Sequence, residues 1–282
     1  MRTTNERMLN AANIGRDFQN TRTLLEIGKK LYLDAVTADV FFVTPTDDGS
    51  SKRIPAHKAL LAATSDVFHT MFFGQLQEIG DVKVEDTTAA IFEEFLQFFY
   101  VETVTLTMDN VAGVIYLGHK YNVIDCFNSG LEVALLYDLA DLKKKCEAKI
   151  SKVTDAVLKS ASFLQCDKRA LNHILNMDVL SCTEKFLFKA CMRWVQHCCT
   201  TNILSRDIVR NCLGDAFYDI RFASMKFEEL ADIVNEFGHL FTGTESKELI
   251  QLVALPNYKA ATFTTKLRTR PQCQQLLGDD AK

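Results

Sequence analysis

The sequence has little that would attract a nucleic acid or a membrane. Its 282 residues include 32 lysines and arginines against 36 aspartates and glutamates, which gives a formal net charge of −4. Because non-specific binding to phosphates requires clustered basic side chains, this balance argues against direct nucleic-acid binding. No apolar run approaches the ~20 residues that a membrane-spanning helix requires. We therefore expect neither a nucleic acid nor a membrane among the partners.

The cysteines lack any regular pairing. Nine are present, none in a C-x-x-C spacing, and only Cys198 and Cys199 are adjacent. The first residues also lack the pattern of a signal peptide. Unpaired thiols of this kind are typical of a reducing compartment, where cysteine acts as a small buried apolar side chain. We expect a soluble intracellular protein in the cytoplasm, with the nucleus left open.

Catalytic motifs are absent as well. The sequence has no G-x-S-x-G, no phosphate-binding glycine loop and no H-E-x-x-H, so we expect neither an enzyme nor a cofactor. The run His197-Cys198-Cys199 does look like a group of metal ligands. A zinc site needs paired ligands from two segments, however, and we place Cys198 on the buried face of a helix, so we expect no metal. Metal analysis of the purified protein would separate this expectation from a metal-dependent or thiol enzyme.

The first half of the sequence alternates strand and helix patterns. The β-branched and aromatic run Asp39–Val43 and the run Lys52–Ile54 flank a polar turn and predict a hairpin. A further strand is predicted around Val82 and Val84. Helices are predicted to begin near Leu24, at Ser65, at Thr87 or Thr88, at Asp109 and at Asp125, the last ending at Leu136. This half is α+β, a small sheet with helices clustered about it.

Helical patterns follow one another from Asp138 onwards. The strongest predicts a helix that buries apolar residues from Leu187 to Cys198, with Trp194 as a core anchor. Ser181 and Glu184 have the spacing of a capping box ahead of it. Further helices are predicted over residues 139–150, 154–164, 203–213, 226–236 and 245–253. The second half is therefore predicted to be all-α.

The stretch Ile54–Glu78 lies at the centre of the first half. Ser65 is placed to cap a short helix, and Gly74 ends it, in the left-handed conformation that glycine adopts cheaply. The apolar residues at helical spacing between them are Val67, Phe68, Met71 and Phe72. The tripeptide Leu76-Gln77-Glu78 follows in a loop, which we expect to be presented to solvent.

This central stretch resembles the signature of the BTB/POZ domain. The residues that carry the resemblance are Pro55, His57, Lys58, Leu61, Ser65, Phe68, Met71 and Phe72. The second half resembles the BACK domain. The short sequence matches that carry this resemblance include Val157-Leu158-Lys159-Ser160, Leu187-Phe188, Arg193-Trp194 and Ile220-Arg221-Phe222. The resemblance implies a flexible arm over residues 1–20, a BTB domain over 21–137, a BACK domain over 138–255, and a tail or shortened linker over 256–282. No Kelch or similar domain is expected after them.

The resemblance also implies two sets of contact residues. Members of the family that bind cullin-3 have a hydrophobic-x-Glu element after the third BTB helix, which Leu76 and Glu78 match. The implied cullin contacts are Phe73, Leu76, Gln77, Glu78, Tyr121 and Asn122. The implied dimer contacts are Leu24, Leu25, Gly28, Leu31, Tyr32, Asp39, Lys58 and Leu61, with the acid and the base in a charged pocket near the subunit interface. On the residues alone, the stripe from Leu24 to Tyr32 would instead pack on its own core.

The expected function is that of a homodimeric substrate adaptor for a cullin-3 RING ubiquitin ligase. Its partners would be the N-terminal domain of cullin-3, a second copy of the chain and a protein substrate that the sequence does not identify. The alternative is a dimeric BTB-BACK scaffold without cullin binding, as in transcriptional regulation or cytoskeletal assembly.

Overall fold

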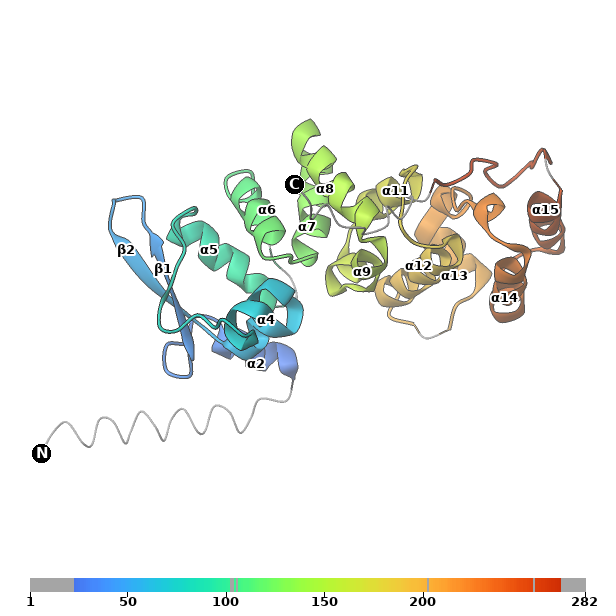
Figure 1. The fold of residues 1–282 in the computed structure, drawn as a ribbon. Helices are drawn as coiled ribbons and strands as arrows, with labels where there is room; N and C mark the ends of the chain where they lie inside the picture. The colour runs from blue at the N-terminus through green and yellow to red at the C-terminus, as the bar shows by residue number, and fades with distance from the viewer. Residues whose placement is uncertain (1–22, 102–103, 105, 202, 256, 270–282) are drawn as a thin grey trace, which may run out of the picture. The chain divides into compact units, whose positions relative to one another are not determined.

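The computed structural model of the chain describes residues 23–101, 104, 106–201, 203–255 and 257–269 (Figure 1). The chain divides into two compact units between Cys126 and Phe127, inside helix α7 (Asp125–Leu136). We call the described residues up to 126 unit 1 and those from 127 to 269 unit 2. The predicted arm over residues 1–20 lies outside the described residues. Within the described ranges, every helix is too short or too polar to span a bilayer.

Unit 1 contains a three-stranded sheet in the order β2-β1-β3. Strand β1 (Val40–Pro45) and strand β2 (Ser51–Ala56) form the predicted antiparallel hairpin, and the short strand β3 (Val82–Lys83) pairs in parallel with β1. The helices are α2 (Leu24–Leu31), α3 (Lys58–Thr64), α4 (Asp66–Phe73), α5 (Ala89–Leu96) with a 3-10 turn at Gln97–Phe99, and α6 (Val111–Lys120). The predicted α+β class is confirmed.

An aromatic cluster forms the core of unit 1. Phe42 from β1 contacts Phe92 from α5, with ring centroids 4.8 Å apart. Tyr121, just after α6, stacks on Phe68 of α4 at 4.3 Å. The sheet and helices that flank the central stretch are thus joined through rings, which contribute apolar burial and specific ring geometry together.

The helix ends of unit 1 agree only in part with those predicted from the sequence. Ser65 caps α4, as predicted, by accepting a hydrogen bond from the backbone N–H of Phe68. The predicted cap at Asp109 is wrong, because α6 begins after Asn110 without a side-chain cap. Gly74 ends α4 but is extended, with φ −74° and ψ −177°, and not left-handed. A Cβ there would lie 2.3 Å from the carbonyl oxygen of Thr70, so close approach explains the glycine better than its backbone angles.

Unit 2 is built from helices, as predicted. They are α8 (Ala140–Lys152), α9 (Thr154–Lys159), α10 (Ala161–Gln165), α11 (Lys168–Asn176), α12 (Glu184–Cys198), α13 (Arg206–Leu213), α14 (Phe227–Phe237) and α15 (Gly243–Ala254). The single helix predicted over 154–164 is two helices, because Ser160 is extended and caps α10. Trp194 is buried, and its indole N–H donates to the carbonyl oxygen of Cys166, which confirms it as a core anchor.

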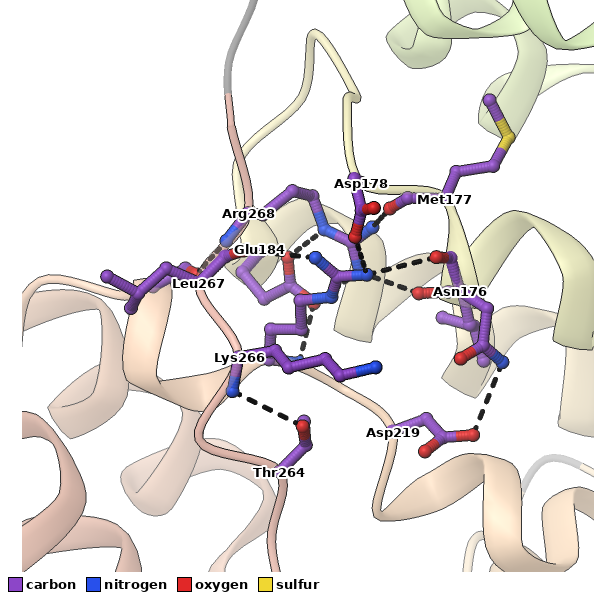
Figure 2. Close-up of polar contacts among 12 residues, drawn as sticks. Asn176, Met177, Asp178, Glu184, Asp219, Thr264, Lys266, Leu267 and Arg268 are labelled. Atoms are coloured by element: carbon purple, nitrogen blue, oxygen red, sulfur yellow. Dashed lines mark hydrogen bonds and ion pairs between the residues drawn. The ribbon is translucent and has the colours of Figure 1, made fainter.

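The capping box predicted at Ser181 and Glu184 does not form. Thr183 caps α12 instead, accepting from the N–H of Phe186, so Glu184 is the first residue of the helix. Its carboxylate points into the interior, where it accepts from the backbone N–H of Arg221 and from the guanidinium of Arg268 (Figure 2). The ion pair is almost fully buried, with side-chain exposures of 2% for Arg268 and 1% for Glu184.

Residues 257–269, which we call the return segment, pack against the helices of unit 2, although the sequence pattern is that of a tail. Phe263 is buried in the aromatic core, 5.2 Å from the ring of Phe222. Arg268 also donates to the carbonyl oxygens of Leu175 and Met177, which lie at the end of α11 (Figure 2). These oxygens lack partners within the helix, so the return segment caps α11.

Candidate partner-binding surfaces

Helix α4 leads into a loop that carries exposed apolar side chains. We call residues 74–80 the exit loop. Leu76 and Ile79 are each 93% exposed, and Phe73, at the end of α4, is 51% exposed. The course of the loop is fixed where the backbone N–H of Glu78 donates to the carbonyl oxygen of Met71, at 2.9 Å. Several large apolar side chains held out from a fixed backbone are typical of a protein-binding surface.

A hollow lies between α4 and the exit loop. Its lining residues are Asp66, Val67, Thr70, Met71, Leu76 and Glu78. The lining combines apolar side chains with the two carboxylates of Asp66 and Glu78. The Asp66 carboxylate accepts from the side-chain amide of Asn122 at 3.0 Å. This arrangement suits an apolar side chain of a partner that has a cationic neighbour.

The predicted cullin contacts are brought together only in part. Phe73, Leu76, Gln77 and Glu78 are all exposed on or beside the exit loop. Asn122 lies beside the hollow through its contact with Asp66. The side chain of Tyr121, in contrast, is 2% exposed, and it is held in the aromatic core of unit 1. It therefore supports the site from inside.

Helix α2 forms a second surface. Gly28 lies against the backbone of Tyr100, where a Cβ would be 2.0 Å from the carbonyl oxygen, and the Tyr32 hydroxyl donates to the carbonyl oxygen of Glu93. These contacts dock α2 on its own unit. Leu24 is left 87% exposed, Leu25 and Leu31 are half-buried, and Val36 beyond the helix is also exposed. The helix thus packs on its own core with one side and presents apolar residues with another.

The other predicted dimer contacts have internal partners. The carboxylate of Asp39 accepts from the backbone N–H of Lys58 at 2.7 Å, at the start of α3. The ammonium group of Lys58 lies 5.6 Å from the ring centre of Phe72. Within one chain, Asp39 and Lys58 therefore meet at the start of α3, and their place near a subunit interface stays a prediction. Leu61 is fully buried in unit 1.

Sequence reasoning missed three residues of these surfaces. Ile79 and Val36 are among the most exposed apolar residues, and Asp66 lines the hollow. Ile79 could have been found from its place directly after Leu76-Gln77-Glu78, in a stretch with no helical or strand period. No local pattern could have identified Asp66, because the hollow depends on how the exit loop folds back.

Exposed apolar residues on a small α+β unit, followed by a helical unit, define the class of protein-interaction modules. Comparison with known families makes the class specific. The model of the BTB/POZ domain matches residues 29–130, and that of the BACK domain, described as "BTB And C-terminal Kelch", matches residues 129–235. The chain thus carries a BTB/POZ domain followed by a BACK domain.

Known relatives are similar to most of the chain. It is 29% identical to human BTB/POZ domain-containing protein 3 over 266 residues, which cover 87% of this chain and 50% of that protein. It is 30% identical to BTB/POZ domain-containing protein 6 of Xenopus tropicalis over 229 residues, 74% of this chain and 43% of that protein. The chain spans about half the length of these relatives.

Proposed function

We propose that the protein is a homodimeric substrate adaptor of a cullin-3 RING ubiquitin ligase, and that the exit loop with its hollow binds the N-terminal domain of cullin-3. The observation that carries the proposal is the position of Leu76, 93% exposed on a loop that follows α4 within the BTB match. Glu78, two residues on, is exposed beside it. Together they have the hydrophobic-x-Glu arrangement expected of cullin-binding members.

The energetics of such a contact are favourable. Burying a leucine side chain fully is worth about 1.5–3 kcal/mol, and a few residues of this size account for most of the affinity of a typical interface. The exit loop loses little conformational freedom on binding, because the Glu78–Met71 hydrogen bond already fixes it. Leu76 would supply most of the binding energy and Glu78 the orientation.

The dimer is proposed for the surface of α2. Leu24 and Val36 are exposed there while Gly28 anchors the helix to its own unit, so a second copy of the chain could cover the apolar side chains. In this function the chain breaks no bond itself. It brings a substrate close to the transfer machinery of the ligase.

Calorimetric titration with the N-terminal domain of cullin-3 tests the proposal. We expect binding at one cullin per chain, weakened at least tenfold by Leu76→Ala and by Glu78→Lys. Met108→Ala is a matched control, because Met108 is an exposed apolar residue of unit 1 outside the exit loop. Light scattering should show that every variant keeps the mass of the wild type. Absence of binding by the folded wild type would contradict the proposal and favour the scaffold function.

A further inference from the structure

A hollow in unit 2 lies between α8 and the end of α11, and we call it the α8 hollow. The ring of His173 on α11 and the carboxylate of Glu147 on α8 both line it, and they contact each other at 2.6 Å. Its volume is about 480 Å³, which is large enough for several side chains of a peptide. The lining residues are Lys144, Glu147, Ala148, Ser151, His173, Asn176, Met177, Asp178 and Val179.

The return segment ends beside this hollow. Thr269 forms a parallel bridge with Val179. The N–H of Thr269 donates to the carbonyl oxygen of Asp178 at 2.9 Å, and its own carbonyl oxygen accepts from the N–H of Leu180 at 3.3 Å. Val179 lines the hollow and is 39% exposed. The last described residue of the chain is therefore held next to the wall of the hollow.

The direction of the bridge points the following chain toward the end of α8. Because the bridge is parallel, the chain leaves Thr269 in the direction that leads to Ser181. Ser181 and Thr154 exchange two hydrogen bonds of 3.0 Å, each from a backbone N–H to the hydroxyl of the other residue. The Thr154 hydroxyl in turn donates to the carbonyl oxygen of Ile150, in the last turn of α8. That turn also contributes Ser151 to the hollow.

The exposed face of α8 is basic. The helix contains five lysines against two acidic residues. Lys144, Lys145 and Lys152 are exposed, and none of them forms an ion pair with another described residue. The apolar part of the hollow comes from Ala148, Met177 and Val179. A segment that complements this surface combines apolar side chains with carboxylates.

Residues 270–282, which we call the terminal segment, follow the return segment directly and lie outside the described residues. Their sequence has the required combination, because Leu276-Leu277 is followed by Asp279-Asp280. Pro271 has no N–H to donate, so it cannot extend the ladder that Thr269 begins. Pairing with residues beyond Leu180 therefore gives way to another course soon after Thr269.

We propose that the terminal segment docks in the α8 hollow of its own chain. Leu276 and Leu277 would contact the apolar part of the hollow, and the carboxylates of Asp279 and Asp280 would lie near the exposed lysines of α8. The chain is long enough, because the ten residues from Thr269 to Asp279 reach up to ~33 Å, whereas α8 rises only ~10 Å from Ser151 to Lys144.

Docking would give the basic face of α8 an internal partner. An acidic segment of another protein would then reach these lysines only by displacing the terminal segment. The attraction between exposed charges is screened by salt, so the docked population should fall as the ionic strength rises. The inference does not depend on cullin binding, because every residue that it uses belongs to unit 2.

Carbodiimide cross-linking of the full chain tests this inference. The reagent joins a lysine amine to a neighbouring carboxylate as an amide, and it takes up the water that is lost. We expect a linked peptide pair in which Lys144 or Lys145 is joined to Asp279 or Asp280. A mixture of isotope-labelled and unlabelled chains distinguishes the two possible sources of the link, since a link within one chain joins peptides of the same label.

The two leucines provide the first variant. Leu276→Asp with Leu277→Asp should abolish the link, although every lysine and carboxylate that forms it is still present. Leu267→Asp is the matched control, because Leu267 is a 68% exposed leucine of the return segment, and this variant should retain the link. Circular dichroism shows that each variant is folded.

A charge exchange provides the second variant. Lys144→Glu with Lys145→Glu should speed up hydrogen exchange at the amides of residues 272–280 several-fold. Adding Asp279→Lys and Asp280→Lys to that variant should slow the exchange again, because the opposite charges are restored. Lys247→Glu, at an exposed position of α15, should leave the exchange unchanged.

Two results would overturn the inference. Links that form only between differently labelled chains would assign the hollow to the terminal segment of a second copy. Hydrogen exchange of residues 272–280 in the folded wild type that is as fast as in the variant with both leucines replaced would show that the hollow is open to another partner.

Discussion

Units 1 and 2 differ in where they place charged and apolar side chains. In the described part of unit 1 the buried polar residues are the neutral Thr44 and Ser65, whereas unit 2 buries the charged residues Glu184, Arg221, Glu245 and Glu248. Unit 1 in turn gathers its most exposed apolar residues in two places, around Leu24 and around Leu76. The first unit is organised to bind, and the second is organised around internal charges.

The buried charges of unit 2 have a particular use. A buried ion pair adds little net stability, because both charges lose their water, but removing one partner is costly. Glu184 pairs with Arg268, which lies 84 residues away in the chain. The pair therefore specifies one position for the return segment more than it strengthens the fold. The described residues of unit 1 include no buried ion pair of this kind. The core of unit 1 is closed by aromatic rings instead.

The largest loss of stability is expected from Arg268→Ala, which removes one partner of the buried ion pair that distinguishes unit 2 from unit 1. The substitution leaves the Glu184 carboxylate buried without its guanidinium, which costs about 3–5 kcal/mol. Trp194, the only tryptophan of the chain, lies in unit 2, so its fluorescence during urea unfolding reports that unit.

A double variant is the control for that prediction. Glu184→Gln with Arg268→Met removes both charges, so it should cost less than Arg268→Ala alone. Lys266→Ala, on the same segment but with an exposed side chain, should change little. A loss below about 1 kcal/mol for Arg268→Ala would mean that the return segment does not hold unit 2 together.

A smaller effect is expected in unit 1 from Gly28→Ala. Alanine favours a helix over glycine by about 1 kcal/mol, but the new Cβ would lie 2.0 Å from the carbonyl oxygen of Tyr100. Forcing a methyl group into a packed site costs about 1–3 kcal/mol, so the net change is destabilising. The unfolding curve followed by circular dichroism should shift, while the Trp194 fluorescence transition stays in place.

Gly243→Ala in unit 2 is the matched glycine variant. A Cβ at Gly243 would have no neighbour within 4 Å, so only the helix preference acts, and the change should be neutral or slightly stabilising. Equal destabilisation by the two variants would show that the contact between α2 and Tyr100 is not formed in solution.

The smallest effect concerns the dependence of stability on pH. Burial raises the pKa of Glu245, but hydrogen bonds from Thr242 and Arg210 outweigh it and hold the pKa below its ordinary value of 4.5. Because the folded pKa is depressed, this carboxylate stabilises unit 2 above about pH 4.5, and the contribution is lost as the pH falls through the folded pKa.

Glu245→Gln should therefore reduce the loss of unit 2 stability on acidification. This loss is measured by urea unfolding at neutral pH and below pH 4.5, with Trp194 fluorescence as the signal. Asp81→Asn in unit 1 is the comparison, and its unfolding is followed by circular dichroism because Trp194 reports only unit 2. Arg53 lowers the pKa of Asp81, but both side chains are exposed, so water and salt screen the pair and the change should be smaller. A larger effect at Asp81 than at Glu245 would contradict the contrast between the units.

Local patterns of the sequence were sufficient for most of the fold. The hairpin, α7 and α12 follow from residue spacing, and the cap of α4 follows from Ser65, whose hydroxyl oxygen accepts from the N–H of Phe68 three residues on. The exposure of Leu76 follows from its place in a loop after a buried helix. These features depend on residues a few positions apart, which a single sequence displays.

Contacts between distant residues could not be predicted. The role of Glu184 depends on Arg268, and the burial of Tyr121 depends on rings from α4 and α5. The helical spacing predicts that Cys198 is buried, but this residue is exposed at the end of α12, so that prediction is wrong. In each case the local pattern fits more than one setting, and the tertiary fold selects among them.

Light scattering with and without the N-terminal domain of cullin-3 tests most directly whether unit 1 presents two separate binding surfaces. The wild type should have the mass of a dimer that gains two cullin domains. Leu24→Glu, at an exposed position, should give a monomer that still binds one cullin domain, and Leu76→Asp a dimer that binds none. A single variant that abolishes both dimer and cullin binding in a folded protein, or a monomeric wild type, would contradict the account.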